Sequence, residues 1–174
     1  MTSSKHSTLN VRTSCVSDAH AIVEIEQAVF PDPYSLDTVL RLIEEGYTFA
    51  LVCENGQGEI CGYLLAQCIP PEAELLRIAV SQAARRMGAG GALMAKFLAV
   101  CRARGASELF LEVRASNEAA MSLYRAFGFT QCGVRKQYYK HPCEDAYLFS
   151  RIDQKDAWSG NVCTACPQKI TEER

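Results

Sequence analysis

A glycine-rich turn between a strand-like run and a helix-like period has the residue types of a phosphate-binding site. The apolar run Leu76–Val80 leads to Arg-Arg-Met-Gly-Ala-Gly-Gly at residues 85–91, and an apolar period with Leu93 and Phe97 follows directly. Such a turn can direct consecutive backbone N–H groups into one concavity, where the helix N-terminus adds partial positive charge. The pattern therefore indicates a site for a diphosphate, although the same glycines also fit a tight strand-to-helix turn that binds nothing.

Two common phosphate loops are excluded by the residues around these glycines. A Walker loop ends in Gly-Lys followed by Ser or Thr, whereas Gly90 is followed by Gly91 and Ala92. The dinucleotide fingerprint needs a third glycine, and counting from Gly88 through Gly90 its place is taken by Leu93. The diphosphate ligand must therefore be identified from other parts of the chain.

Two further side chains have the chemistry of proton transfer. Glu112 stands in the otherwise apolar run 108–113, where partial burial would raise its pKa toward neutrality and suit it to act as a base. The alternation in this run also fits a carboxylate on the solvent face of an edge strand. The phenol of Tyr124, with an ordinary pKa of about 10, is protonated at neutral pH and can donate a proton. Because Tyr124 shares a helix face with Ala120 and Phe127, packing in the core is its alternative role.

The composition is that of one soluble globular domain. The chain has 174 residues, of which 48% are hydrophobic and 22% charged, with a formal net charge of −2. This balance does not indicate nucleic-acid binding, and no apolar run approaches the roughly 20 residues of a membrane span. The polar segment 1–10 lacks the apolar core of a secretion signal. We therefore expect a cytoplasmic protein without a membrane or nucleic-acid partner.

The nine cysteines do not form an evident disulfide framework, because their number is odd. Four lie in apolar runs, where a thiol acts as a small hydrophobic group: Cys53, Cys61, Cys68 and Cys101. Cys163 and Cys166 form the only Cys-X-X-Cys motif, in a polar segment. A zinc site there would need two more ligands, for which His141 and Cys143 are the nearest candidates. One such motif is a weak indication, so we expect no metal.

Hydrophobic periodicity and turn residues predict an α/β layered domain around one mixed sheet. The predicted strands are 9–14, 47–54, 59–69, 74–80, 108–113, 129–136 and 143–152. The predicted helices begin at Ser17 or Asp18, at Ser35, after the glycine turn, and at Ser116 or Asn117. Because the chain is polar and patternless from Asp153, we expect a domain over 1–152 and a flexible extension over 153–174.

This order of elements, with its Arg-Arg-Met-Gly-Ala-Gly turn, resembles the GNAT superfamily of acyl-CoA-dependent N-acetyltransferases. Further segments resemble the bacterial ribosomal-protein alanine N-acetyltransferases of the RimI type: residues 111–117 with 123–129, residues 30–35, and Tyr138-Tyr139 with Glu144-Asp145-Ala146. The resemblance spans roughly Val11 to Ile152. It implies the GNAT fold, with a mixed central sheet of six to seven strands flanked by about four helices.

The resemblance also implies how acetyl-CoA, as co-substrate, would be bound. The pantetheine arm would pair with the backbone of Ile78, Ala79 and Val80. The diphosphate would be wrapped by the turn residues Arg86, Met87, Gly88, Ala89, Gly90 and Gly91. Asn117 would contact the cofactor from the other side, although from the sequence alone it is a helix cap.

By the same resemblance, Glu112 would be the general base, directly or through a water, and Tyr124 the general acid for the leaving thiolate. Tyr34, Tyr138 and Tyr139 would line the slot for the acceptor, a protein N-terminus such as the N-terminal alanine of a ribosomal protein. An α-amine suits a single carboxylate base, because at pH 7 roughly a tenth of it is neutral against less than a thousandth of a lysine, a gap of about 3 kcal/mol. Acetylation of lysine or of a small amine, and a non-catalytic acyl-CoA-binding module, remain alternatives.

Three departures from the family pattern bear on these expectations. Tyr34 stands where the subfamily commonly has Trp, so the acceptor contact there can differ. Gly91 stands where many relatives have Arg, which removes one phosphate contact. The cysteine-bearing segment after Ile152 is outside the family pattern.

Overall fold

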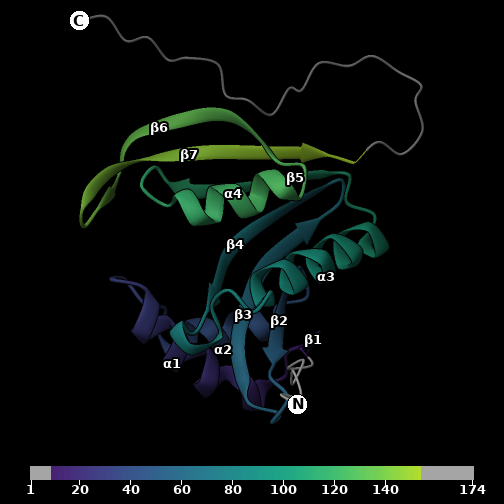
Figure 1. Ribbon diagram of the computed structural model, residues 1–174. Helices are drawn as coiled ribbons and strands as arrows, with labels where there is room; N and C mark the ends of the chain where they lie inside the picture. Colours follow the sequence, from purple (N-terminus) through teal and green to yellow (C-terminus); the bar gives the residue numbers. More distant parts are fainter. Residues whose placement is uncertain (1–8, 154–174) are drawn as a thin grey trace, which may run out of the picture.

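The computed structural model describes residues 9–153, and over this range it confirms the predicted order of elements (Figure 1). The strands are β1 Asn10–Thr13, β2 Thr48–Glu54, β3 Ile60–Ile69, β4 Glu72–Val80, β5 Glu108–Arg114, β6 Thr130–Lys140 and β7 Cys143–Ile152. The helices are α1 Ala19–Val29, α2 Leu36–Glu44, α3 Ala89–Arg104 and α4 Glu118–Ala126, with the short 3-10 helices η1 Val16–Asp18 and η2 Gln82–Ala84. One mixed sheet with four α-helices is the predicted GNAT architecture.

The seven strands form one sheet in the order β1-β2-β3-β4-β5-β7-β6. Neighbouring strands are antiparallel except for β4 and β5, which are parallel. Strand β5 therefore lies inside the sheet, between β4 and β7. The strand that carries Glu112 is therefore not an edge strand of the sheet, although its pairing with β4 ends at Leu111.

The parallel pairing of β4 with β5 covers only half of β4. It runs from Glu72 opposite Glu108 to Leu75 opposite Leu111 and stops there, whereas β4 stays paired with β3 as far as Val80. The β3–β4 register shifts at the same point, so that Leu76 has no opposite residue and forms a β-bulge. A bulge bends its strand. In Figure 1, β5, β6 and β7 accordingly run across the top, while β2, β3 and β4 turn downward from them.

Helices cover both faces of the sheet, and each face has its own core. On one face α1 and α2 bury their apolar side chains against β2 and β3, with Ala19, Ile22, Ile25, Val39, Leu42, Ala50, Val52, Tyr63, Leu65 and Ala79 in the cluster. On the other face α3 and α4 pack on Phe49, Leu51, Leu64, Leu109, Leu111, Val113 and their neighbours. Within β5, Leu109, Leu111 and Val113 thus face α3 and α4, so Phe110 and Glu112 face the opposite side.

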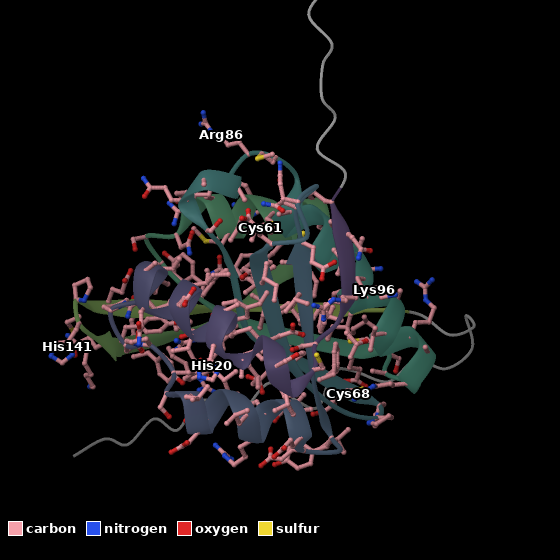
Figure 2. The ribbon with its side chains drawn as sticks, turned by 90° about the horizontal axis from the view of Figure 1, so that it is seen from below. His20, Cys61, Cys68, Arg86, Lys96 and His141 are labelled. Carbon is pink, nitrogen blue, oxygen red and sulfur yellow. The ribbon has the colours of Figure 1, made fainter. Side chains whose placement is uncertain are left out.

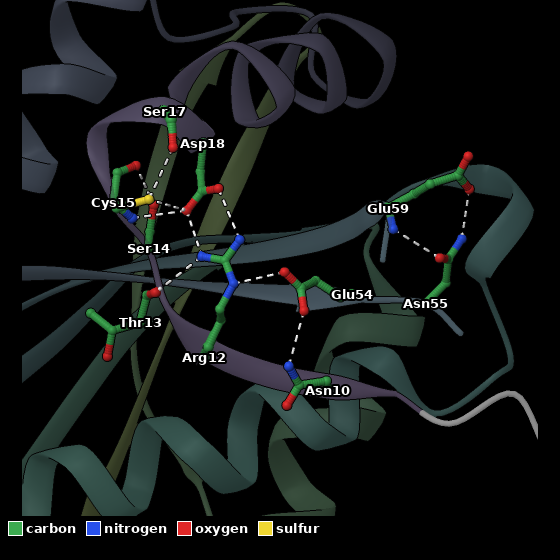
Figure 3. Close-up of polar contacts among 10 residues, drawn as sticks. All are labelled: Asn10, Arg12, Thr13, Ser14, Cys15, Ser17, Asp18, Glu54, Asn55 and Glu59. Atoms are coloured by element: carbon green, nitrogen blue, oxygen red, sulfur yellow. Dashed lines mark hydrogen bonds and ion pairs between the residues drawn. The ribbon is translucent and has the colours of Figure 1, made fainter. Parts of the chain in front are cut away.

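An ion-pair cluster fixes the first strand and the start of the first helix (Figure 3). The Arg12 guanidinium donates to Asp18 at 2.7 and 3.0 Å and to Glu54 on β2 at 2.7 Å. Hydrogen bonds from the Arg12 guanidinium hold the pKa of Asp18 well below its usual range. Asp18 occupies the predicted capping position of α1, but its side chain bonds to Arg12 and the Cys15 N–H and makes no cap hydrogen bond. The position was therefore predicted correctly and the interaction was not.

One other boundary differs from the prediction, and a second corresponds to one of the two predicted positions. Strand β6 continues to Lys140 and so contains Tyr138 and Tyr139, because a register shift between Arg135 and Tyr139 lets the pairing with β7 resume. Helix α4 is capped by Asn117, whose Oδ1 accepts the Ala120 N–H at 3.1 Å. The predicted alternative, Ser116, lies outside the cap position.

The four cysteines predicted to be core residues are all buried, and Figure 2 shows Cys61 and Cys68 within the body of the molecule. Burial raises the pKa of Cys53 and of Cys101 to about 12 each. Cys163 and Cys166 lie outside the described residues. Within residues 9–153 no group of three or more His, Cys, Asp or Glu side chains is placed to hold a metal ion. Over the same range no helix combines the length and hydrophobicity of a membrane span.

The α3 side of the core gives a stability prediction. Phe97 is fully buried and stacks on Phe49, with 6.1 Å between ring centroids. We expect Phe97→Ala to lower the free energy of unfolding by about 3–5 kcal/mol, because it removes apolar contacts and leaves a cavity. Lys96→Ala, on the exposed side of the same helix, should change it by less than about 0.5 kcal/mol. Urea unfolding of both variants measures the difference, and equal midpoints would contradict this packing.

Candidate active site

A cavity of about 490 Å³ contains all three tyrosines predicted to contact the acceptor. We call it the tyrosine-lined cavity; its walls are Pro31, Asp32, Tyr34, Glu74, Leu75, Leu76, Arg77, Glu112, Arg114, Tyr138, Tyr139, Lys140 and His141. These residues come from the segment between α1 and α2, from the middle of β4, from the end of β5, and from the β6–β7 hairpin. The cavity thus lies where β4 and β5 diverge, in the interior of the strand order.

A second cavity of about 550 Å³ lies further along the same face of the sheet. We call it the sheet-face cavity; its lining includes Gln67, Pro70, Glu74, Phe110, Glu112 and Arg135. Glu74 and Glu112 line both cavities. The two carboxylates therefore stand at the boundary between the cavities.

Glu112 projects from β5 on the face opposite α3 and α4. Its Oε1 forms an ion pair with Arg135 Nη1 of β6 at 2.8 Å, and its side chain retains 20% of its exposure. Tyr138 and Tyr139 lie close enough that the Glu112 charge, after burial, raises the pKa of both phenols, for Tyr139 to about 12. A carboxylate that is ordered, partly exposed and directed into a cavity can accept a proton from a bound amine.

One wall of the tyrosine-lined cavity is held by a buried ion pair. Glu26 of α1 is fully buried and accepts from Arg77 Nη1 of β4 at 2.7 Å, from the Tyr34 N–H at 2.9 Å and from the Tyr63 hydroxyl. The Arg77 guanidinium lies 3.9 Å from the ring centroid of Tyr34 and 4.4 Å from that of Phe30. The segment after α1, with Tyr34, is therefore attached directly to the strand that carries the bulge.

The opposite wall is held by a second ion pair. Arg114, at the end of β5, pairs with Glu144 of β7 at 2.9 Å, and its guanidinium lies 4.0 Å from the ring centroid of Tyr139. Glu144 also accepts the N–H of Ser116 at 3.1 Å. These contacts hold the β6–β7 hairpin against the end of β5, while His141 at its tip lies at the outer edge of the molecule (Figure 2).

Tyr124 lies on the α4 side of the sheet, opposite the face from which Glu112 projects. Its ring is buried and packs on Phe129 and Phe149, with centroids 6.3 and 6.4 Å away. Burial, with a smaller effect of Tyr139, raises the pKa of the phenol above its ordinary value. The hydroxyl thus stays protonated at neutral pH, and Tyr124 is also the core residue that the alternative interpretation described.

The glycine turn has the backbone geometry of a strand-to-helix turn with free N–H groups. Gly88 caps α3 with φ +90°, and Arg86 also has a positive φ of 64°. The first N–H groups of a helix have no partner within the helix, so those at Gly90 and Gly91 can bind an anion. A Cβ on Gly88 or Gly91 would meet no atom within 4 Å, so both face open space. The Arg86 side chain extends away from the molecule in Figure 2.

Beyond the bulge, successive residues of β4 direct their backbone N–H and C=O groups to opposite sides of the strand. The Ser81 N–H donates to the Cys61 carbonyl at 2.9 Å. Because hydrogen-bonded pairs alternate along an antiparallel ladder, Ala79 bonds to Tyr63 of β3, whereas Ile78 and Val80 direct their N–H and C=O groups away from β3. Of the three residues predicted to pair with pantetheine, Ile78 and Val80 therefore face the divergence and Ala79 does not.

Sequence reasoning missed the charged residues that build the walls of the site. Glu26 follows Ile22 by one helical turn, so it occupies a position where the apolar face of α1 predicts a hydrophobic residue. Arg77 is a single cation within the apolar run of β4. Charged residues at positions that a pattern assigns to the core were the available signal, because a buried charge requires a partner.

Comparison with known proteins gives one family. Residues 19–129 match the model of the acetyltransferase (GNAT) family. A [ribosomal protein bS18]-alanine N-acetyltransferase from Haemophilus ducreyi is 34% identical over 132 residues, 76% of this chain and 90% of the relative. The protein of that name from Escherichia coli K12 is 35% identical over 123 residues, 71% of this chain and 82% of the relative.

A solved structure agrees with these relatives. The crystal structure of the ribosomal-protein-S18-alanine N-acetyltransferase from Escherichia coli is similar with a TM-score of 0.80 and 27% identity. The match covers 89% of this chain and all of the other.

The buried ion pair of Glu26 and Arg77 gives a second stability prediction. We expect Arg77→Met to lower the free energy of unfolding by about 3–5 kcal/mol, because it leaves the Glu26 carboxylate buried without its cation. The matched control is Arg41→Met, which removes an exposed pair with Glu45 on α2 and should cost about 0.5 kcal/mol or less. Urea unfolding compares the two. Equal losses would show that the Glu26–Arg77 pair contributes no more than a surface pair.

Proposed function

This chain belongs to the acetyltransferase (GNAT) family, and from that premise we propose that it transfers an acetyl group from acetyl-CoA to the free α-amine of a protein. The acceptor we propose is the N-terminal alanine of a cytoplasmic ribosomal protein of the bS18 type, since the relatives at 34–35% identity carry that name. The observation that carries the proposal is the position of Glu112. It faces the tyrosine-lined cavity at the point where β4 and β5 diverge.

The chain offers suitable groups for acetyl-CoA on both sides of this divergence. Ile78 and Val80 present unpaired backbone groups to an extended, amide-containing arm such as pantetheine. The turn from Arg86 to Gly91 presents N–H groups and an α-helix N-terminus to the diphosphate. When bound, acetyl-CoA supplies a thioester, which is an activated acetyl group. Asn117 uses its Oδ1 as a cap, so only its amide N–H₂ is left to donate to the cofactor.

The reaction needs one proton acceptor and one proton donor, and we assign these roles to two side chains on opposite faces of the sheet. Glu112 accepts the proton of the acceptor ammonium group, which leaves a neutral amine that can attack the thioester carbonyl. Tyr124 donates its phenolic proton to the departing thiolate, and its raised pKa keeps the phenol protonated until then. In this assignment the acceptor enters from the tyrosine-lined cavity and the thioester lies between the two groups.

A peptide assay tests both the acceptor and the base. We expect the wild type to acetylate an alanine-starting peptide at pH 7 and an N-terminally blocked peptide with an internal lysine about 100-fold more slowly, because the lysine is harder to deprotonate. Glu112→Gln should lower kcat on the first peptide about 100-fold. Glu108→Gln is the matched control, since Glu108 is on the same strand and face but lines neither cavity. It should retain activity within twofold.

Two outcomes of this assay would change the assignment. Faster turnover of the lysine peptide would make the ε-amine the acceptor. Full activity of Glu112→Gln would remove Glu112 from the role of base.

The glycine turn is tested separately through the co-substrate. We expect Gly88→Ala to raise KM for acetyl-CoA several-fold with KM for the peptide unchanged, because alanine at φ +90° costs about 1 kcal/mol or more and shifts the turn. Gly46→Ala is the control, since a Cβ there meets nothing within 4 Å and the backbone is unstrained. Steady-state kinetics with each substrate varied measures both constants. An unchanged KM for acetyl-CoA in Gly88→Ala would exclude the turn from the binding site.

A further inference from the structure

Glu74 of β4 is a second carboxylate beside the proposed base, and no role has yet been assigned to it. In the parallel register of β4 and β5, Glu74 lies opposite Phe110, and Glu112 is two residues further along β5. Residues two apart on a strand point to the same face, and both carboxylates line both cavities. The two side chains therefore face the same space from neighbouring strands.

The partners of the two carboxylates differ. Glu112 has Arg135 as its counter-ion at 2.8 Å. Glu74 takes part in no ion pair within residues 9–153, and its Oε2 accepts one hydrogen bond from the Gln67 amide of β3 at 3.1 Å. An ion-paired carboxylate binds a proton less readily than one with a neutral partner in the same cavity. A proton that reaches this pair is thus held more favourably on Glu74.

The cavities on either side suggest a direction for that proton. Both carboxylates line both cavities, but the tyrosines line only the cavity that we assign to the acceptor, and Gln67, the partner of Glu74, lines only the sheet-face cavity. An acceptor bound in the tyrosine-lined cavity leaves the sheet-face cavity accessible to water. Glu74, which is hydrogen-bonded to Gln67 on that side, is therefore placed to pass a proton from Glu112 to this water.

We propose that Glu74 is a second proton acceptor, which takes over the proton that Glu112 removes from the acceptor and releases it to water in the sheet-face cavity. The proposal rests on the proposed function. In the first step an N–H bond of the ammonium group breaks and an O–H bond forms on Glu112, leaving a neutral amine. In the second the proton moves to the Glu74 carboxylate and restores Glu112 as an anion. In the third it passes from Glu74 to water, so that no proton accumulates in the site.

The electrostatic surroundings of Glu74 agree with this role. Burial, followed by the charge of Glu112, raises the pKa of Glu74 above its ordinary value, while Arg135 and the Gln67 hydrogen bond oppose the shift. The other ionisable residues that line the tyrosine-lined cavity are Asp32, Tyr34, Arg77, Arg114, Tyr138, Tyr139, Lys140 and His141, and those that line the sheet-face cavity include Glu72 and Cys132. A carboxylate with a raised pKa accepts protons more readily near neutral pH.

The test is the pH dependence of Glu74→Gln with an alanine-starting peptide and acetyl-CoA. We expect kcat/KM to fall about tenfold at pH 7 and to come within twofold of the wild type above pH 9, where the α-amine is already neutral and needs no base. Glu108→Gln should follow the wild type at every pH. Adding Glu74→Gln to Glu112→Gln should lower activity no further than about threefold, because the two groups act in series.

The outcomes separate a proton acceptor from a residue that only shapes the cavity. A loss of equal size at pH 7 and above pH 9, or no loss at either, would overturn the proposal. Urea unfolding of Glu74→Gln should give the wild-type midpoint, and the ratio of activities at the two pH values remains informative even where it does not. A wild type that acetylates only the lysine peptide would refute the proposed acceptor instead. The same comparison would then be made on that peptide, with the recovery expected above pH 11.

Discussion

The site depends on one interruption in the sheet: β4 leaves β5 after Leu75 while it remains paired with β3. The bulge at Leu76 supplies the bend at that residue, because one extra residue in β4 has no partner across the ladder. Beyond it, the backbone groups of Ile78 and Val80 have no strand to bond. An extended ligand with its own amides can satisfy them. The position of Glu112, directly after the last residue of β5 that pairs with β4, follows from the same interruption.

The segments on the two sides of this divergence are each held by an ion pair, of which one is buried and one partly exposed. The Glu26–Arg77 pair ties the segment with Tyr34 to β4 just after the bulge, and the Arg114–Glu144 pair ties the β6–β7 hairpin to the end of β5. Each guanidinium also lies against a tyrosine ring of the cavity. The two walls are therefore attached to different parts of the sheet, and the cavity between them exists because those parts separate.

The fold was predictable from the sequence because its signals are local. Periodicity and turn residues give the order of strands and helices, and Asn117 is recognisable as a helix cap. The resemblance to a known family brought together Glu112, Tyr124 and the tyrosines, and the structure places Tyr34, Tyr138 and Tyr139 with Glu112 around one cavity. The termination of the β4–β5 pairing at Leu75 was not predictable, because it depends on the register of segments more than 30 residues apart in sequence.

The charged residues that sequence analysis missed also depend on pairing between segments that are distant in sequence. Glu26, Arg77 and Glu74 acquire their partners only through the sheet, so pattern analysis along the chain finds an ill-fitting charge without its counterpart. For the same reason the sequence could not show which of Ile78, Ala79 and Val80 directs its backbone groups toward the divergence. Which backbone groups of β4 point outward is decided by the hydrogen-bonding phase of β3, and the sequence of β4 does not contain that information.

The most direct test of this account is amide hydrogen exchange of β4, measured by NMR with and without acetyl-CoA. We predict that acetyl-CoA slows exchange at Ile78 and Val80, whose N–H groups face the divergence, while Ala79, bonded to β3, is already protected and changes little. Slowed exchange confined to the glycine turn, or none at all, would contradict the claim that the interrupted β4–β5 pairing is where the co-substrate binds.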